Sequence, residues 1–253
     1  MKSYLQPPAL LITMAIVLVT APAAYAVTRG EAEETARLIG TLLSAGRVVI
    51  ERNQSLIDDP SKGDKGFTPA VFEHQLVDEF RLRTGIDVTN MNEVNIPPAA
   101  KGLLHALVES SKAVVSDAQD TINRKGVGYK NFIPAGFGSQ AAARFSAQSH
   151  VKLKQTTLNP RNPDNAPDDY ERAVLQRMLV QPSQSVTINQ VTDEGTLRVL
   201  TPIYYTKDCL TCHGSPAGQM DISGHRKEGA EEGDLAGAIS VSVPLEQRNA
   251  VER

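Results

Sequence analysis

The residues of this sequence that are best suited to chemistry form one short run, CLTCHG, at positions 209–214. The pattern Cys-x-x-Cys-His is the attachment signature of a c-type haem. If the run forms a helical turn, Cys209 and Cys212 lie on one face, where their thiols can form thioether bonds to the haem vinyl groups. His213 rises from the same turn and can offer an imidazole nitrogen to the iron. The spacing therefore predicts one covalent haem c, with His213 as an axial ligand.

A redox-active disulfide and half of a zinc site are the two alternative interpretations of this run. A zinc site needs further thiolates or a pair of closely spaced histidines, and the sequence has only 2 cysteines. A thioredoxin-like site opens a helix within a βαβ pattern, and no such pattern is found. Haem is favoured because a histidine follows the second cysteine directly.

The first residues have the pattern of a secretory signal. Lys2 precedes an apolar run over 8–20, and the stretch ends in an Ala-x-Ala cleavage site at Ala26. We therefore expect residues 1–26 to be a signal peptide and the mature chain to be soluble and periplasmic. An uncleaved anchor is the alternative, but the apolar run falls short of the about 20 residues that a membrane span needs. Haem c is also assembled outside the cytoplasm, so motif and compartment agree.

Composition excludes several classes of function. The formal net charge is −3 and no basic cluster is found, so nucleic acid is not an expected partner. A single close pair of cysteines does not make a disulfide scaffold. No Ser-His-Asp order or phosphate-binding glycine-rich loop is found, so hydrolytic and kinase chemistry has no support.

The first part of the mature chain reads as helices that occur in two copies. Apolar residues recur at three-and-four spacing over 31–57 and again over 69–84, before Gly85. A shift of 65 residues places the pattern Lys-x-Phe-x-Pro-Ala-x-Phe at 65–72 on the same pattern at 130–137. Because the loop matches as well as the helix periodicity, we interpret segments 36–88 and 101–153 as a duplicated helix-loop-helix unit.

The second part reads as a mainly antiparallel sheet. Alternation predicts strands at 151–156, 185–191, 196–205 and 236–243, with a helix that starts at Asp168 or Asp169 and ends near Val180. Helices followed by strands indicate the α+β class. We expect an N-terminal helical repeat unit at 27–98 and a haem domain at 99–253, in which the second repeat unit at 101–153 leads into the sheet.

Several motifs occur together in one order along the chain. They are the Lys-x-Phe-x-Pro-Ala-x-Phe pattern at 130–137, LKQT at 153–156, RNPxNAPD at 161–168, the CLTCHG run, and GDLAGAISV at 233–241. This set resembles a family of exported c-type haem domains of unknown function, found alone or as sensory ectodomains of membrane-bound signalling proteins. The resemblance covers most of the mature chain. It implies a PAS-like antiparallel sheet that carries the haem on Cys209 and Cys212, with His213 as axial ligand.

The resemblance also implies what the haem is for. We expect a periplasmic monohaem c-type cytochrome that acts in electron transfer or redox sensing with a partner protein. The alternative is a haem-based sensor that binds a small gas at an open sixth iron position. An oxidoreductase acting on a small substrate has the least support. Some relatives use a cysteine as second axial ligand, and this sequence has no third cysteine.

The sixth iron ligand and the partners of the haem propionates stay open at this stage. Helix and strand patterns place three histidines on polar faces and one in a glycine-rich loop, whereas one methionine lies on an apolar face and another follows the haem motif closely; they are His74, His105, His150, His225, Met178 and Met220. Arg161, Arg226 and Lys227 are candidate propionate partners. Arg161 is equally suited to bracing its own Asn-Pro turn.

Overall fold

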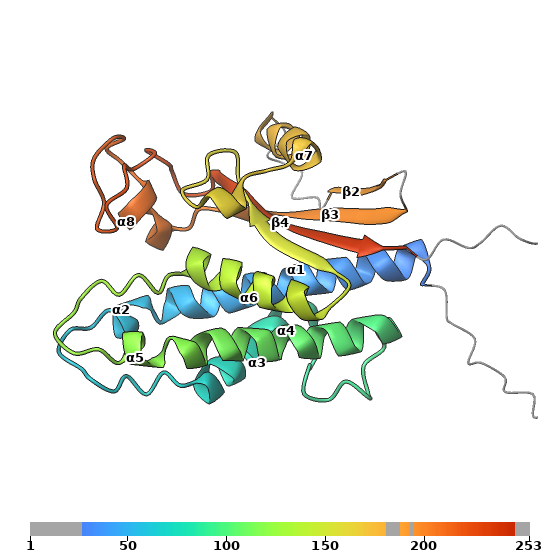
Figure 1. Cartoon of the computed structure of the whole chain (residues 1–253), viewed down its shortest axis with the longest axis horizontal. Helices are drawn as coiled ribbons and strands as arrows, with labels where there is room; N and C mark the ends of the chain where they lie inside the picture. Colours follow the sequence, from blue (N-terminus) through green and yellow to red (C-terminus); the bar gives the residue numbers. More distant parts are fainter. Residues whose placement is uncertain (1–26, 181–187, 193–194, 246–253) are drawn as a thin grey trace, which may run out of the picture.

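The protein consists of a helical layer and a four-stranded antiparallel sheet (Figure 1). The structure, a computed structural model, describes residues 27–180, 188–192 and 195–245. Within these residues the α-helices and 3₁₀ turns are α1 (Arg29–Arg52), α2 (Gln54–Ile57), α3 (Pro69–Thr84), α4 (Pro98–Asp117), α5 (Gln119–Ile122), α6 (Pro134–Gln148), η1 (Pro163–Asn165), α7 (Asp169–Val180), η2 (Lys207–Cys209) and α8 (Leu210–His213). The strands are β1 (Lys152–Thr156), β2 (Ile188–Val191), β3 (Thr196–Tyr204) and β4 (Leu235–Pro244).

The helical layer contains two copies of one unit, as the matched motifs predict. Helices α1, α2 and α3 form the first copy, and α4, α5 and α6 form the second. The two copies share the way in which α3 and α6 begin. Pro69 and Pro134 occupy the first turns of these helices, where the missing N–H of proline is not needed. The hydroxyl of Thr68 also caps α3 by accepting from the amide of Val71, whereas Ile133 at the equivalent position of α6 makes no such bond. Gly85, at φ 73°, ends α3 in the left-handed conformation that glycine adopts without strain.

Each copy contributes the same contacts to the other. The side-chain amide of Gln54 donates to the carbonyl of Phe132 at 3.2 Å, and that of Gln119 donates to Phe67 at 3.0 Å. On the axis between the copies, the equivalent rings of Phe72 and Phe137 lie 5.2 Å apart between centroids. A contact in which the partners exchange roles is the mark of an isologous interface. The duplicated units therefore pack as a pseudo-symmetric pair within one chain.

The first predicted helix is interrupted, and this corrects the expectation of one helix over 31–57. Helix α1 ends at Arg52 and α2 begins at Gln54. The side-chain amide of Asn53 donates to the carbonyl of Val49, which competes with the regular main-chain pattern. The same interruption separates α4 from α5 at Ala118, so it belongs to the repeated unit rather than to Asn53 alone.

The sheet has the order β1-β4-β3-β2 and is antiparallel throughout. Alternating residues of β3 and β4 point to opposite faces. Leu197 and Val199 belong to the same hydrophobic cluster as α1 and α6, whereas Leu200 packs with Val174 and Met178 of α7. Helices α1 and α6 therefore cover one face of the sheet, and α7 covers the other (Figure 1).

The α+β class predicted from the sequence is confirmed, and the strands lie within two residues of their expected places wherever they are described. The expected signal peptide at 1–26 and the start of the strand expected at 185–191 lie outside the described residues. The division into units at 27–98 and 99–253 stays a prediction. Within the described ranges, no helix combines the length and the apolar character that crossing a membrane requires.

Candidate functional site

The Cys-x-x-Cys-His run forms the helical turn that its spacing predicts. It follows directly on β3, where η2 (Lys207–Cys209) passes into α8 (Leu210–His213). Both thiols are free and partly exposed. The turn is held tight at its end, because a Cβ added to Gly214 would lie 2.6 Å from the carbonyl oxygen of Leu210. Among the described residues, no group of three or more His, Cys, Asp or Glu side chains is placed so that it could hold a metal ion such as zinc.

His213 is held at both its ring and its main chain. Ring atom Nδ1 lies 2.8 Å from Oε2 of Glu228. The amides of Gly229 and Ala230 donate to the carbonyl of His213 at 3.0 and 2.9 Å. The ring of Tyr205 lies against the imidazole, with 4.9 Å between ring centroids. Residues 228–230 thus fix the orientation of His213 from a loop that follows it in the chain.

Burial favours the neutral form of this imidazole. Burial lowers the pKa of His213 despite its hydrogen bond to Glu228. Burial acts to raise the pKa of Glu228, but hydrogen bonds from Arg161 and His213 outweigh it and hold that pKa below its usual value. A carboxylate only accepts hydrogen bonds, so Nδ1 of His213 carries the proton. Nε2 is then left with a lone pair, as an axial iron ligand needs.

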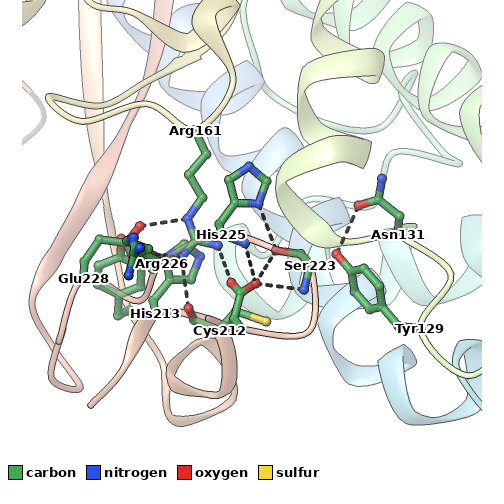
Figure 2. A network of polar contacts seen from close by, with 11 residues as sticks. Tyr129, Asn131, Arg161, Cys212, His213, Ser223, His225, Arg226 and Glu228 are labelled. Atoms are coloured by element: carbon green, nitrogen blue, oxygen red, sulfur yellow. Dashed lines mark hydrogen bonds and ion pairs between the residues drawn. The ribbon is translucent and has the colours of Figure 1, made fainter. Parts of the chain in front are cut away.

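Arg161 ties the haem motif to a distant turn. Its guanidinium donates to Asp221 at 2.7 Å and to Glu228 at 2.8 Å, and it donates to the carbonyl of Cys212 at 2.9 Å (Figure 2). Burial acts to lower the pKa of Arg161, but its hydrogen bonds to Glu228 and Asp221 outweigh burial and raise that pKa. Arg161 therefore braces the haem segment and not its own Asn-Pro turn, which corrects one of the two roles considered for it.

Asp221 organises the loop between the haem motif and Glu228. Its side chain is 0% exposed. One carboxylate oxygen accepts from the amide and hydroxyl of Ser223 and from the amide of His225, and the other accepts from Arg161. These bonds outweigh the effect of burial and hold the pKa of Asp221 far below its usual range. The loop thereby acquires a fixed shape around a buried carboxylate.

A cavity of about 300 Å³ opens beside Cys212 and His213. Ligand sites in proteins begin at about this size. Its walls come from the sheet, from the helical layer and from the loop after the haem motif. Figure 2 shows Tyr129 and Asn131 of the second repeat unit across from Arg161 and His225. The lining also includes Arg47, Ile133, Gln155, Thr156, Ile203, Tyr205, Glu228 and Gly237.

The comparisons with known proteins agree with the motif set. A family model described as Tll0287-like matches residues 26–244. The chain belongs to the Tll0287-like family. Among solved structures, it is similar to the crystal structure of the cyanobacterial heme-protein Tll0287, with 20% identity and a TM-score of 0.41. That alignment covers 59% of this chain and 97% of the other. A search of curated proteins found no match.

The candidates for the sixth iron ligand differ in whether they line the cavity. His225 lines the cavity, and its Nδ1 lies 3.1 Å from the hydroxyl of Ser223. The other candidates do not line it: the exposed residues His74, His105, His150 and Met220, and the buried residue Met178. Met178 faces from α7 onto the sheet, where it packs with Leu200 and Ala238, as its apolar position predicts.

The candidate partners of the haem propionates also differ in whether they line the cavity. Arg161 lines the cavity but is engaged by two carboxylates. Arg226 is exposed and donates to the carbonyl of Gly218 at 2.9 Å, and neither Arg226 nor Lys227 lines the cavity. The arginine that sequence reasoning missed is Arg47 of α1.

Several residues of the candidate site gave no signal of their own in the sequence. Glu228, Asp221 and Tyr205 act through contacts with residues distant in the chain or in a different element. Arg47 was hidden within an apolar helix pattern. A charged residue next to that buried stripe, between Gly46 and Val49, was the one available signal.

Proposed function

We propose that this protein is a periplasmic monohaem c-type cytochrome that acts in electron transfer or redox sensing. One observation carries the proposal. Cys209, Cys212 and His213 follow one another in a short helical segment, in which Cys212 and His213 line a cavity, and the hydrogen bond to Glu228 leaves Nε2 of His213 available for iron. The family is named after Tll0287, which is described as a cyanobacterial haem protein.

The cavity suits a group of the chemistry of haem. Tyr205, Ile203 and Ile133 supply ring and aliphatic surface, as an apolar macrocycle needs. Nε of Arg47, one of the lining residues, is shielded from solvent and has no hydrogen-bond partner among the described residues. Buried polar groups are nearly always paired. A ligand with an apolar body and polar groups at its edge can pack against the apolar side chains of the cavity and also pair with its polar ones.

Each protein residue then has a definite role. Cys209 and Cys212 hold the haem covalently, and bound haem supplies an iron that cycles between ferrous and ferric states. His213 binds the iron through Nε2. Glu228 accepts from Nδ1 and makes the imidazole a more basic ligand. Arg161 holds Glu228 and the carbonyl of Cys212 in place.

The surrounding architecture and the compartment belong to the same proposal. The antiparallel sheet, with α7 on the face away from the helical layer, supports the PAS-like fold that the family resemblance implies. The signal-like pattern over 1–26 supports export to the periplasm, where a redox partner protein would be met.

His225 is the sixth ligand that we propose. Tyr129 also lines the cavity, but burial raises the pKa of its hydroxyl and disfavours the phenolate that iron would need. His225 has a ring fixed at Nδ1 by Ser223. An iron with two imidazole ligands suits electron transfer, because neither position is open to a small molecule.

A gas sensor is the second candidate function, and the position of His225 favours it. His225 is exposed and is held within its own loop, where Asp221 accepts from its amide and Ser223 lies beside its Nδ1. In this alternative His225 remains in the loop, and the sixth iron position stays open.

Carbon monoxide binding to the reduced protein tests the choice. If His225 binds the iron, carbon monoxide binds slowly to the wild-type protein and rapidly to His225→Ala. Met220→Ala is the matched control, because Met220 lies in the same loop and is exposed. Rapid binding to wild type and H225A alike would contradict the bis-histidine proposal and support the sensor.

A further inference from the structure

Arg47 has a guanidinium group that the protein alone leaves incompletely paired. Its Nε is shielded from solvent and lacks a hydrogen-bond partner among the described residues. The nearest acid on the same helix face, Glu51, accepts instead from the hydroxyl of Thr206. Burial lowers the pKa of Arg47, although the charges of Cys209 and Glu51 oppose that effect. Arg47 as a whole is half-buried, and a cation whose guanidinium is partly shielded from water is destabilising unless an anion lies beside it.

The position of Arg47 indicates which kind of anion its guanidinium can bind. Arg47 lines the same cavity as Cys212 and His213. A guanidinium fork matches a carboxylate, which accepts several hydrogen bonds at once.

The internal duplication shows that this feature belongs to the cavity and not to the repeated unit. The position that corresponds to Arg47 in the second copy is Lys112. Lys112 lies on the outer side of the helical layer, where it pairs with Glu73 at 2.9 Å and with Glu109 at 3.0 Å. The cation of the second copy thus has protein partners, whereas that of the first copy lines the cavity.

We infer that Arg47 binds a propionate carboxylate of the haem. This inference rests on the proposed function. It replaces Arg161, Arg226 and Lys227 as propionate partners, because Arg161 is engaged by Asp221 and Glu228 and the other two do not line the cavity. Arg47 is a positioning residue, since it would hold the edge of the cofactor rather than the iron.

The holoprotein, purified from a host that matures c-type haem, allows a direct test with Arg47→Gln, Arg47→Lys and the control Lys112→Gln. Removing a positive charge near the haem favours the ferric state, so R47Q should have a lower midpoint potential. The expected change in the reduction equilibrium is on the order of tenfold. R47K should retain most of the potential, and K112Q should match wild type. Resonance Raman bands of propionate bending should shift in R47Q and in R47K, but not in K112Q.

Two results separate the inference from the proposed function. Wild-type protein without covalent haem would overturn the function, and the inference with it. R47Q with full haem content, and with the potential and propionate bands of wild type, would overturn the inference alone. If R47Q does not fold, R47K decides, because an ammonium cannot reproduce the bidentate contact. Unshifted propionate bands in R47K would then contradict the inference.

Discussion

Glu228 sets the chemical character of His213. It accepts from Nδ1 at 2.8 Å, and its own pKa is held low by hydrogen bonds from Arg161 and His213 against the effect of burial. A carboxylate behind an iron-bound imidazole raises the basicity of the ligand. A more basic ligand favours ferric iron, so this carboxylate should keep the potential of the haem low.

Glu228→Gln should therefore raise the midpoint potential, both because the imidazole becomes less basic and because a negative charge near the iron is lost. Spectroelectrochemical titration measures this shift. Glu232→Gln is the control, since Glu232 is exposed in the following loop. A potential equal to that of wild type in E228Q would show that Glu228 does not act on an iron ligand.

The buried carboxyl of Asp221 leads to a prediction about how the stability of the protein depends on pH. Its carboxyl has a folded-state pKa far below the unfolded value of about 3.9. The stabilisation is therefore fully present above about pH 4 and is lost as pH falls through the folded-state pKa. Asp221→Ala should lower the free energy of unfolding by about 2 kcal/mol at neutral pH, because amides and a guanidinium lose their acceptor.

Urea unfolding of wild type and D221A at a series of pH values tests this. Below pH 4 the difference between them should shrink, as the wild-type carboxyl becomes protonated in the unfolded state first. A difference that is constant from pH 7 down to pH 2 would contradict the assigned role of Asp221.

At the scale of elements, the close packing of the two repeat units depends on one glycine of α1. A Cβ added to Gly46 would lie 2.9 Å from the ring of Phe137 and 3.6 Å from that of Phe72. These rings form the contact on the pseudo-symmetry axis. Overpacking in a filled core is destabilising by about 1–3 kcal/mol.

Gly46→Ala should therefore destabilise the protein in spite of the higher helix propensity of alanine. Gly102→Ala is the matched control, because Gly102 lies in α4, is exposed, and has open space around the added Cβ. That change should stabilise by about 0.5–1 kcal/mol. Thermal unfolding measures both effects: the melting temperature should fall in G46A and rise in G102A. A stabilised G46A would argue against the pseudo-symmetric packing.

The elements themselves were largely predictable from the sequence. The boundaries Pro69–Thr84 and the start of α7 at Asp169 follow from caps, proline and glycine, which act locally. The Cys-x-x-Cys-His turn is equally local. The interruption at Asn53 was missed, because both sides of it continue the same apolar periodicity.

At the scale of the whole molecule, the cavity joins parts that are far apart in the sequence. Arg47 comes from the first repeat unit, Tyr129 from the second, and His213 from the segment after β3. Periodicity tells which face of an element is buried, but not which other element covers it. The roles of Arg161 and Asp221, 60 residues apart, could not be predicted for the same reason.

The duplication gives this arrangement its asymmetry. Helix α1 of the first copy packs against β3 and β4, whereas its equivalent in the second copy, α4, packs against the other helices α1, α3 and α6 (Figure 1). Equivalent positions of the two copies thus face different surroundings, as Arg47 and Lys112 do. A pseudo-symmetric scaffold can in this way carry a single haem site at one end.

Covalent attachment of one haem at Cys209 and Cys212 is the central claim, and intact-mass measurement after acid–acetone extraction tests it most directly. Protein from a host that matures c-type haem should have the mass of the chain plus one haem, and the double variant Cys209→Ala/Cys212→Ala should have the mass of the chain alone. A wild-type protein that shows no added haem, or that loses all of its haem to the extraction, would contradict the account.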